Sequence, residues 1–337
     1  MTFQTLALML GYDCNAKCRC CLWGDMLSRG PRIDVKEARG WIEEACGELN
    51  VQILGFSGGE SFLYQDEMIE LAEYAKSRYN VPSAASTNGF WAKSPEIAER
   101  ILLRMRAAGL SQLLLSVDDF HQEHVPLERI KNAFEVARKL GIVSVLQCLV
   151  TKNSHKLAYY KRKLGVAKDD NLVVASQIGC TKVGWAATRI PSEEFRPRRT
   201  ALTSYCSMFR PVIITPAGDV HLCCGPAFAI PGLTAGNLRQ ESLREILQRA
   251  EWDPLFNALV LGNGPSLLAR RLKGTEWEHL RKPIFSSSCE ACHCMMTTPG
   301  VSERLREKLE EDRSALFLKR VILEQESPES LNKMVNI

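Results

Sequence analysis

The chain contains 337 residues, of which 45% are hydrophobic and 24% are charged, and it has a net charge of +4 and 13 cysteines. This length and composition are typical of a folded protein with one large domain and a small one, or with two ordinary domains. The charge is too weak to indicate a nucleic-acid partner, and no apolar run is long enough to cross a membrane.

Short apolar runs alternate with amphipathic stretches from residue 5 to about residue 180. Nearly every residue in the runs is apolar, which is typical of parallel strands covered on both faces. Helices are expected after Asp34, at Ser94-Pro95, at Pro126 and after Asn153. Six such units predict an α/β fold, a partial (β/α)6 TIM-like barrel. The six runs lie at residues 5–10, 51–56, 82–87, 111–117, 143–150 and 171–179.

The stretch GYDCNAKCRCCLWGD directly follows the first run and contains Cys14, Cys18, Cys20 and Cys21. In a parallel barrel the chemistry lies on loops after the carboxyl ends of the strands. Cys14, Cys18 and Cys21 have the spacing C-x3-C-x2-C, one thiolate fewer than a closed structural metal site needs. Three ligands suit a [4Fe–4S] cluster with one open iron. The alternative is a zinc knuckle with Cys20 as the fourth ligand.

This spacing resembles the signature of the radical S-adenosylmethionine (SAM) superfamily, in which the open iron binds SAM. The resemblance implies that Cys20 is a packing residue. Loops after the later runs are similar to family segments in the same order, and TKVGWA (181–186) resembles a further one. The SAM-binding residues implied by these loops are Gly58, Gly59 and Glu60 for the methionine amino group, Ser86, Thr87 and Asn88 on the ribose side, and Ser116, Asp118 and Asn153.

The resemblance also implies the chemistry. SAM is cleaved reductively to methionine and a 5′-deoxyadenosyl radical, which takes a hydrogen atom from the substrate. The electron comes from an external one-electron donor such as flavodoxin or ferredoxin. The protein supplies position and a dry cavity.

Three residues near the expected site are candidates for catalysis. Asp119 and His121 follow the fourth run in DDFHQEHVP, where they are predicted to bind substrate or take a proton. The alternative is a polar loop before the next helix. Cys180 ends the sixth run, and either it or Cys224 is a candidate to return a hydrogen atom to a substrate radical. The alternative for Cys180 is a buried structural cysteine.

The second half begins with CSMFRPVIITPAGDVHLCCG, which predicts two short strands joined by a turn with positive φ at Gly218. GNL and CEACHC follow, and this order resembles the auxiliary-cluster extension called SPASM, or twitch in its shortened form. A zinc ribbon is the alternative. The sequence leaves open Cys224 in place of Cys223, and Cys294 in place of Cys292. The ligands that the resemblance implies for a second [4Fe–4S] cluster are Cys206, Cys223, Cys289 and Cys292.

Three domains are therefore predicted: a radical SAM core at 1–200, an auxiliary-cluster domain at 201–300, and a C-terminal helix and tail at 301–337. Clustered cysteines without a signal peptide predict metal binding and a cytoplasmic location. The leading functional prediction is modification of a peptide or protein side chain. One alternative is dehydrogenation of a carbohydrate-like alcohol. The other is a non-catalytic iron–sulfur protein for electron transfer or scaffolding.

Overall fold

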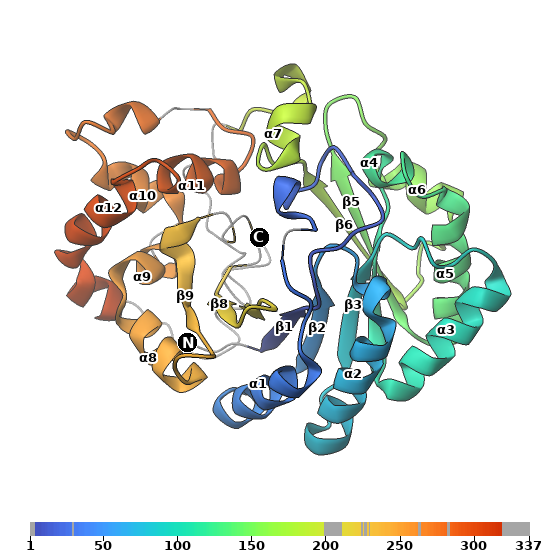
Figure 1. Ribbon diagram of the computed structural model, residues 1–337. Helices are drawn as coiled ribbons and strands as arrows, with labels where there is room; N and C mark the ends of the chain where they lie inside the picture. Colours follow the sequence, from blue (N-terminus) through green and yellow to red (C-terminus); the bar gives the residue numbers. More distant parts are fainter. Residues whose placement is uncertain are drawn as a thin grey trace. The chain divides into compact units, whose positions relative to one another are not determined.

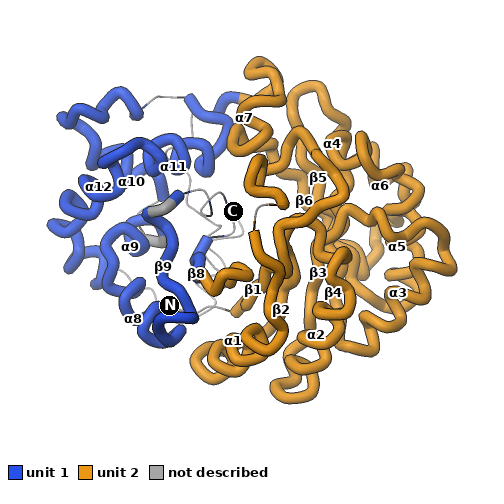
Figure 2. Tube along the Cα trace, viewed as in Figure 1, with its two compact units in different colours: residues 1, 197–211, 220–337 blue, residues 2–196, 212–219 orange. Residues whose placement is uncertain are grey.

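The structure is a computed structural model that describes residues 4–28, 30–198, 211–223, 225, 228, 230–261, 264–281 and 284–318. The chain divides into two compact units, which Figure 2 shows in different colours. One unit contains residues 2–196 and 212–219, and we call it the barrel unit. The other contains residues 1, 197–211 and 220–337, and we call it the C-terminal unit.

The barrel unit is built on a parallel sheet, of which Figure 1 shows the strands side by side. The strand order is β6-β5-β4-β3-β2-β1, and β7 lies next to β1. Each of the six apolar runs forms one of these strands, so the predicted unclosed (β/α)6 barrel is confirmed. Thr5 pairs with Ile53 and Met9 with Ser57, which places the carboxyl ends of neighbouring strands at one edge. The strands are β1 (Thr5–Met9), β2 (Ile53–Ser57), β3 (Ser83–Thr87), β4 (Leu110–Ser116), β5 (Val143–Val150), β6 (Val173–Gly179) and β7 (Pro211–Ile214).

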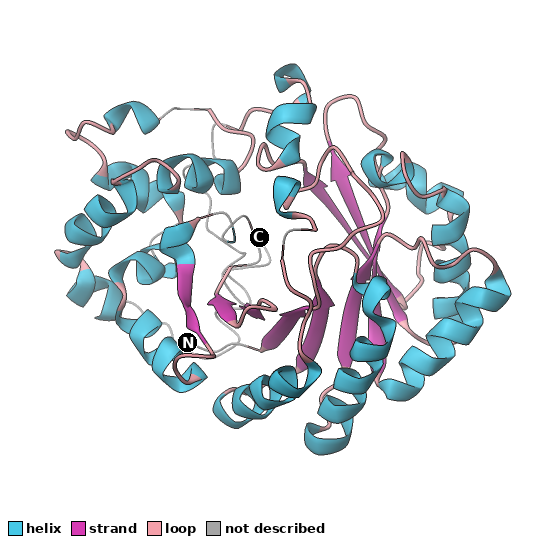
Figure 3. Cartoon of the chain, viewed as in Figure 1, coloured by secondary structure: helices cyan, strands magenta, loops and turns pink. Residues whose placement is uncertain are grey.

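Helices alternate with these strands, as Figure 3 shows in cyan and magenta. Asp34 caps the first by accepting a hydrogen bond from the Glu37 amide, and Ser94 caps the third. The prediction that Asn153 caps a helix is wrong, because that helix begins at Leu157 after a longer loop. The helices are α1 (Val35–Glu48), α2 (Gln65–Tyr79), α3 (Pro95–Ala108), α4 (Asp119–Gln122), α5 (Leu127–Lys139), α6 (Leu157–Lys163) and α7 (Trp185–Arg189).

Burial differs between the middle and the end of this sheet. In β5 every second residue is buried, among them Leu146 and Cys148. In β6, by contrast, Val174 is 53% exposed and Ile178 is 46% exposed. The expectation that all strands are covered on both faces is therefore wrong for β6. The strand order explains the difference, because β6 is the last strand of the sheet and pairs only with β5 among the described residues.

The C-terminal unit contains most of β8 and all of β9 (Thr234–Asn237), followed by helices. The turn before β8 (Asp219–His221) has Gly218 at a φ of 87°, which confirms the predicted positive φ. Ser242 and Glu245 form a capping box at the start of α8. No helix among the described residues is long and apolar enough to span a membrane. The helices are α8 (Leu243–Trp252), α9 (Pro254–Leu261), α10 (Pro265–Arg271), α11 (Ser288–Met296) and α12 (Val301–Glu310).

Candidate active site

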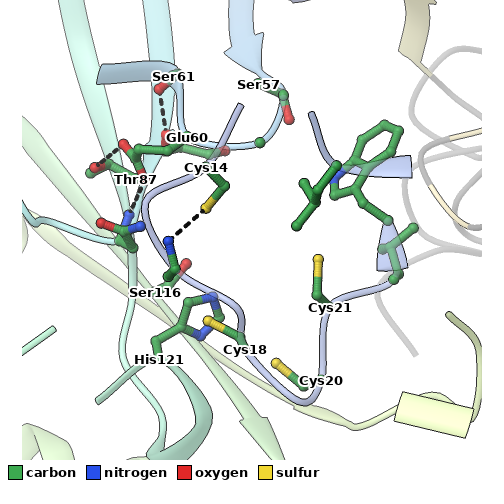
Figure 4. Close-up of a pocket in the computed structure, with 18 of the residues that line it drawn as sticks. Cys14, Cys18, Cys20, Cys21, Ser57, Glu60, Ser61, Thr87, Ser116 and His121 are labelled. Carbon is green, nitrogen blue, oxygen red and sulfur yellow. Dashed lines mark hydrogen bonds between the residues drawn. The ribbon is translucent and has the colours of Figure 1, made fainter. Parts of the chain in front are cut away.

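A cavity of about 260 Å³ opens at the carboxyl ends of the barrel strands, and Figure 4 shows part of its lining. The loops after β1, β2, β3 and β4 supply most of its walls. Cys20, Gln147 and Leu149 also line it, although the sequence did not single them out as cavity residues. The predicted site residues that the structure brings together here are Cys14, Cys18, Cys21, Gly58, Gly59, Glu60, Ser86, Thr87, Asn88, Ser116 and His121.

The thiols of Cys14, Cys18 and Cys21 surround one part of this cavity (Figure 4). Burial raises the pKa of all three, that of Cys14 to about 11. A buried thiolate needs a compensating positive charge, which a bound metal provides. This donor set therefore fits a metal centre better than three inert thiols.

The spacing of these thiols also bears on the kind of metal centre. In the part of the chain described, Cys20, Asp118 and His121 form a group of three possible metal ligands whose ligand atoms all lie within 4.8 Å of one another. Cys14, Cys18 and Cys21 form no such group, so their sulfur atoms do not all lie within 4.8 Å of one another. This spacing favours a multi-iron cluster over the zinc knuckle. Cys20 also packs in an apolar cluster with Phe120 and Cys180.

The loop after β2 holds the cysteine loop through backbone contacts. The amide of Gly59 donates to the Gly11 carbonyl at 3.0 Å, and the amide of Glu60 donates to the Asp13 carbonyl at 2.8 Å. Gly58 has a φ of 141°, and a Cβ there would lie 2.5 Å from the Gly11 oxygen. A Cβ on Gly59 would overlap the Asp13 carbonyl. The glycines are therefore required because the two loops approach each other closely.

Glu60 is buried and is held by three donors. Its Oε1 accepts from the Phe62 amide at 3.2 Å and from the Thr87 hydroxyl at 2.6 Å, and its Oε2 accepts from the Asn88 amide at 2.7 Å. Burial raises its pKa to about 7, and these three hydrogen bonds limit the rise. A carboxylate has about four acceptor positions, so one remains for a ligand.

The segment after β3 ties this carboxylate to the rest of the site. Thr87 donates to Glu60 and accepts from the Gly89 amide and the Trp91 indole, each at 3.0 Å. The side-chain amide of Asn88 donates to Asn15 Oδ1 at 3.0 Å. Loops after β1, β2 and β3 therefore form one hydrogen-bonded network.

A further element fixes the end of the cysteine loop. The Trp185 amide donates to the Cys21 carbonyl at 2.9 Å, and its indole donates to Asp25 Oδ1 at 2.9 Å. Gly184 has a φ of 59°, and a Cβ there would lie 2.7 Å from the Cys21 oxygen. The sequence marked TKVGWA (181–186) only as a family-like segment, and its Gly-Trp pair is the signal for this contact.

His121 brings an ionisable side chain to the cavity from α4. Its Nδ1 lies 2.8 Å from Asp118 Oδ1, which also accepts from the His121 amide at 3.0 Å. Asp118 Oδ2 accepts from the Leu149 amide at 3.2 Å. Burial lowers the pKa of His121, but the charges of Asp118 and Glu60 outweigh it, so the pKa is raised. Asp118 does not line the cavity, and it positions the imidazole that does.

Three other predicted residues do not line the cavity. The Asp119 carboxylate accepts hydrogen bonds from the amide of His155 at 3.0 Å and from the Tyr160 hydroxyl, and the His155 ring lies 3.0 Å away. Cys180 is buried in the apolar cluster that contains Cys20. Asn153 is exposed in the loop before α6. The structure therefore brings none of the three into the cavity wall.

The C-terminal unit brings two predicted cluster ligands together. A Cβ on Gly225 would lie 3.4 Å from the sulfur of Cys223 and 3.5 Å from that of Cys289. Cys289 and Cys292 are three residues apart on α11 and share a helix face, whereas Cys294 is five residues from Cys289 and does not. Cys206 and Cys224 lie outside the described residues.

Comparisons with known proteins agree with both sites. A model of the radical SAM superfamily matches residues 8–153, and a model of the SPASM iron–sulfur cluster-binding domain matches residues 206–293. The chain is 28% identical over 295 residues to the putative peptide biosynthesis protein YydG of Bacillus subtilis (strain 168), with 86% of this chain and 91% of YydG covered. It is 26% identical over 121 residues to GTP 3',8-cyclase of Paenarthrobacter nicotinovorans, covering 35% of this chain and 32% of that protein.

One solved structure shares the fold over almost the whole chain. The structure of native anSMEcpe with bound AdoMet and Cp18Cys peptide has a TM-score of 0.56 and 14% identity, and the match covers 94% of this chain and 99% of anSMEcpe. The partial parallel barrel and the three thiols of its cavity agree with these matches. The chain carries a radical SAM domain over residues 8–153 and a SPASM domain over residues 206–293.

The two matched domains imply the cofactors: SAM and a [4Fe–4S] cluster for the radical SAM domain, and iron–sulfur binding for the SPASM domain. The residues present fit these groups, because one buried and two half-buried thiols line the cavity and Glu60 has an acceptor position left. When bound, the cluster supplies the electron that cleaves SAM. The residues that line the cavity would hold and orient these groups.

Proposed function

We propose that this radical SAM enzyme modifies a side chain of a peptide or protein with the help of an auxiliary cluster. The observation that carries the proposal is the match to YydG, whose name assigns it to peptide biosynthesis. That match spans 86% of the chain, so it extends over residues of both units. A cytoplasmic location suits this function, because thiols stay reduced there.

Each part of the barrel site has a proposed task. Cys14, Cys18 and Cys21 hold the cluster, and the Glu60 carboxylate binds the amino group of SAM. The charge on Glu60 suits an ammonium partner, and its three hydrogen bonds keep the carboxylate oriented. His121 contacts the substrate, because it is the one of the three predicted catalytic residues that lines the cavity.

The second cluster is assigned to the C-terminal unit. We propose Cys206, Cys223, Cys289 and Cys292 as its ligands. The sulfur atoms of Cys223 and Cys289 both lie close to Gly225, which supports these two cysteines as ligands of one cluster. The shared face of α11 supports Cys292 over Cys294. An external carrier of the flavodoxin or ferredoxin type delivers the electron.

The test uses the reconstituted full-length protein under anaerobic conditions with SAM and dithionite. The substrates are short peptides encoded next to its gene, supplied in D2O. We expect 5′-deoxyadenosine together with a peptide that has lost hydrogen or gained deuterium, detected by mass spectrometry. The matched control replaces Cys14, Cys18 and Cys21 with alanine and yields neither product.

Two other outcomes separate the alternatives. If the peptide stays unchanged while an added sugar alcohol is oxidised, the substrate is a small molecule and not a peptide. No 5′-deoxyadenosine from the wild type, with its iron content intact, would mean that the protein does not cleave SAM. Either result contradicts the proposal.

A further inference from the structure

We propose that an extended peptide with apolar and acidic side chains binds by adding a strand to the edge of β6 that no other described strand pairs with. This inference rests on the proposed peptide substrate and adds where that substrate docks. Strand addition uses main-chain hydrogen bonds for affinity and alternate side chains for selectivity. The features of β6 that support it are its bonding pattern, its lack of protective residues and its continuity with the cavity.

The bonding pattern leaves one edge of β6 available. The Ser144 amide donates to the Leu172 carbonyl, and the Cys180 amide donates to the Val150 carbonyl, each at 2.8 Å. Because backbone groups alternate in direction along a strand, even-numbered residues of β6 bond to β5 and odd-numbered ones point away. Within the described ranges, the amides of Ala175 and Gln177 have no backbone acceptor.

The sequence of this strand lacks the usual protection of an edge. Natural edge strands carry lysine, proline or a bulge, which blocks pairing with another chain. The strand VVASQIG has no charged residue and no proline, and its pairing with β5 is regular over seven residues. A strand edge of this length without protective residues is expected where the strand binds another peptide segment.

The exposed apolar side chains of β6 continue the cavity wall. Gln147 and Leu149 line the cavity, and they pair with Ser176 and Ile178 in the next strand. Paired residues on adjacent strands point to the same face, so Ser176 and Ile178 extend the lining toward the free edge. Val174 and Ile178, both about half exposed, offer apolar contacts to alternate side chains of an added strand.

Charge on the surrounding segments favours an acidic peptide. Residues 151–196 carry nine lysines and arginines against four acidic residues, whereas the whole chain has a net charge of only +4. Lys152, Arg189 and Arg196 are exposed on the loops and helix that follow β5 and β6. Acidic residues flanking the apolar positions of a peptide would be attracted to them.

The test measures binding and hydrogen exchange in the reconstituted full-length protein. The probe is a fluorescent synthetic peptide of about ten residues that alternates Val or Ile with Thr and ends in glutamates. Ala175→Pro removes one edge amide without disturbing the pairing with β5, and Ala175→Thr keeps that amide as the control. We expect about tenfold weaker binding for Ala175→Pro and no change for Ala175→Thr. In the wild type, the probe should slow exchange of the Ala175 and Gln177 amides.

Several outcomes would overturn the inference. Equal binding by both variants would place the peptide elsewhere, and so would a probe that leaves edge exchange unchanged. Slow exchange before the probe is added would show that the edge is already covered. If Ala175→Pro instead alters the oligomeric state, a second copy of the chain occupies the edge. None of these readouts uses turnover, so failure of the proposed peptide chemistry would be seen separately, as probe binding without modified product.

Discussion

The two ends of the parallel sheet use their hydrogen-bonding groups differently. The loops after β1, β2 and β3 are joined by hydrogen bonds. The buried carboxylate of Glu60 accepts three of them. At β6, the Ala175 and Gln177 amides have no backbone acceptor in the described structure, and Val174 is half exposed. The same barrel thus combines a closed network with an open edge.

This difference matches two different demands. A cofactor that takes part in every reaction cycle needs a site of fixed geometry, which buried side chains held by several hydrogen bonds provide. The peptide substrate that we propose needs groups that are still able to bond, which an exposed strand edge provides. The two regions meet where His121, Gln147 and Leu149 line the cavity.

The strongest disruption of the closed end replaces Cys14, Cys18 and Cys21 with alanine. The variant should lose the barrel cluster and all formation of 5′-deoxyadenosine, while the C-terminal unit keeps its own iron. Iron and sulfide analysis after anaerobic reconstitution should give about four irons, against about eight in the wild type. Loss of all iron would contradict a second cluster.

A smaller disruption changes one charge in the same network. Glu60→Gln keeps the shape of the side chain but removes its charge, and should weaken SAM binding about hundredfold. In the wild type, the Glu60 pKa is raised to about 7 by burial, so the carboxyl becomes neutral as pH falls through that value. SAM binding should therefore weaken below about pH 7, and the variant should lose this dependence.

Equilibrium binding of SAM between pH 6 and 8 measures both effects. Glu99→Gln is the control, because Glu99 pairs with Lys139 on an exposed surface away from the cavity lining. Unchanged SAM affinity in Glu60→Gln would remove Glu60 from the cofactor site.

The sequence predicts the parts of this site that depend on local spacing. The six strands, the cap at Asp34 and the positive φ of Gly218 follow from residue patterns a few positions long. The cysteine spacing and the order of the loop motifs identify the cavity wall, because carboxyl ends of parallel strands meet at one edge.

Other features depend on contacts between segments far apart in the chain. The Trp185–Cys21 hydrogen bond joins residues that no local pattern connects. The exposure of β6 follows from its being the last strand of the sheet, whereas its apolar sequence resembles that of a covered strand. Asp119 was expected at the site because of its neighbours in sequence, but its carboxylate contacts His155 and Tyr160 instead.

A backbone change at the closed end should affect stability. Gly59→Ala places a methyl group against the Asp13 carbonyl, so the two loops must separate. We expect the free energy of unfolding to fall by about 2 kcal/mol. Gly40→Ala is the control, because that helical position has no atom within 4 Å of an added Cβ, and it should gain about 1 kcal/mol. Urea unfolding of both variants measures the contrast, and equal stabilities would mean that the loop contact is not required.

The smallest expected effects separate two neighbours at the junction of the closed and open regions. Asp119→Asn removes the charge that accepts hydrogen bonds from His155 and Tyr160, and should lower the free energy of unfolding by about 1 kcal/mol without changing turnover. His121→Ala removes a side chain of the cavity wall, and should lower turnover of the peptide about tenfold while SAM cleavage without peptide is unchanged. Peptide product and 5′-deoxyadenosine measured in parallel distinguish the two. If both variants turn over the peptide normally, neither residue acts on the substrate. If the Asp119→Asn variant is fully stable but turns over the peptide more slowly, Asp119 has the role that we assign to His121.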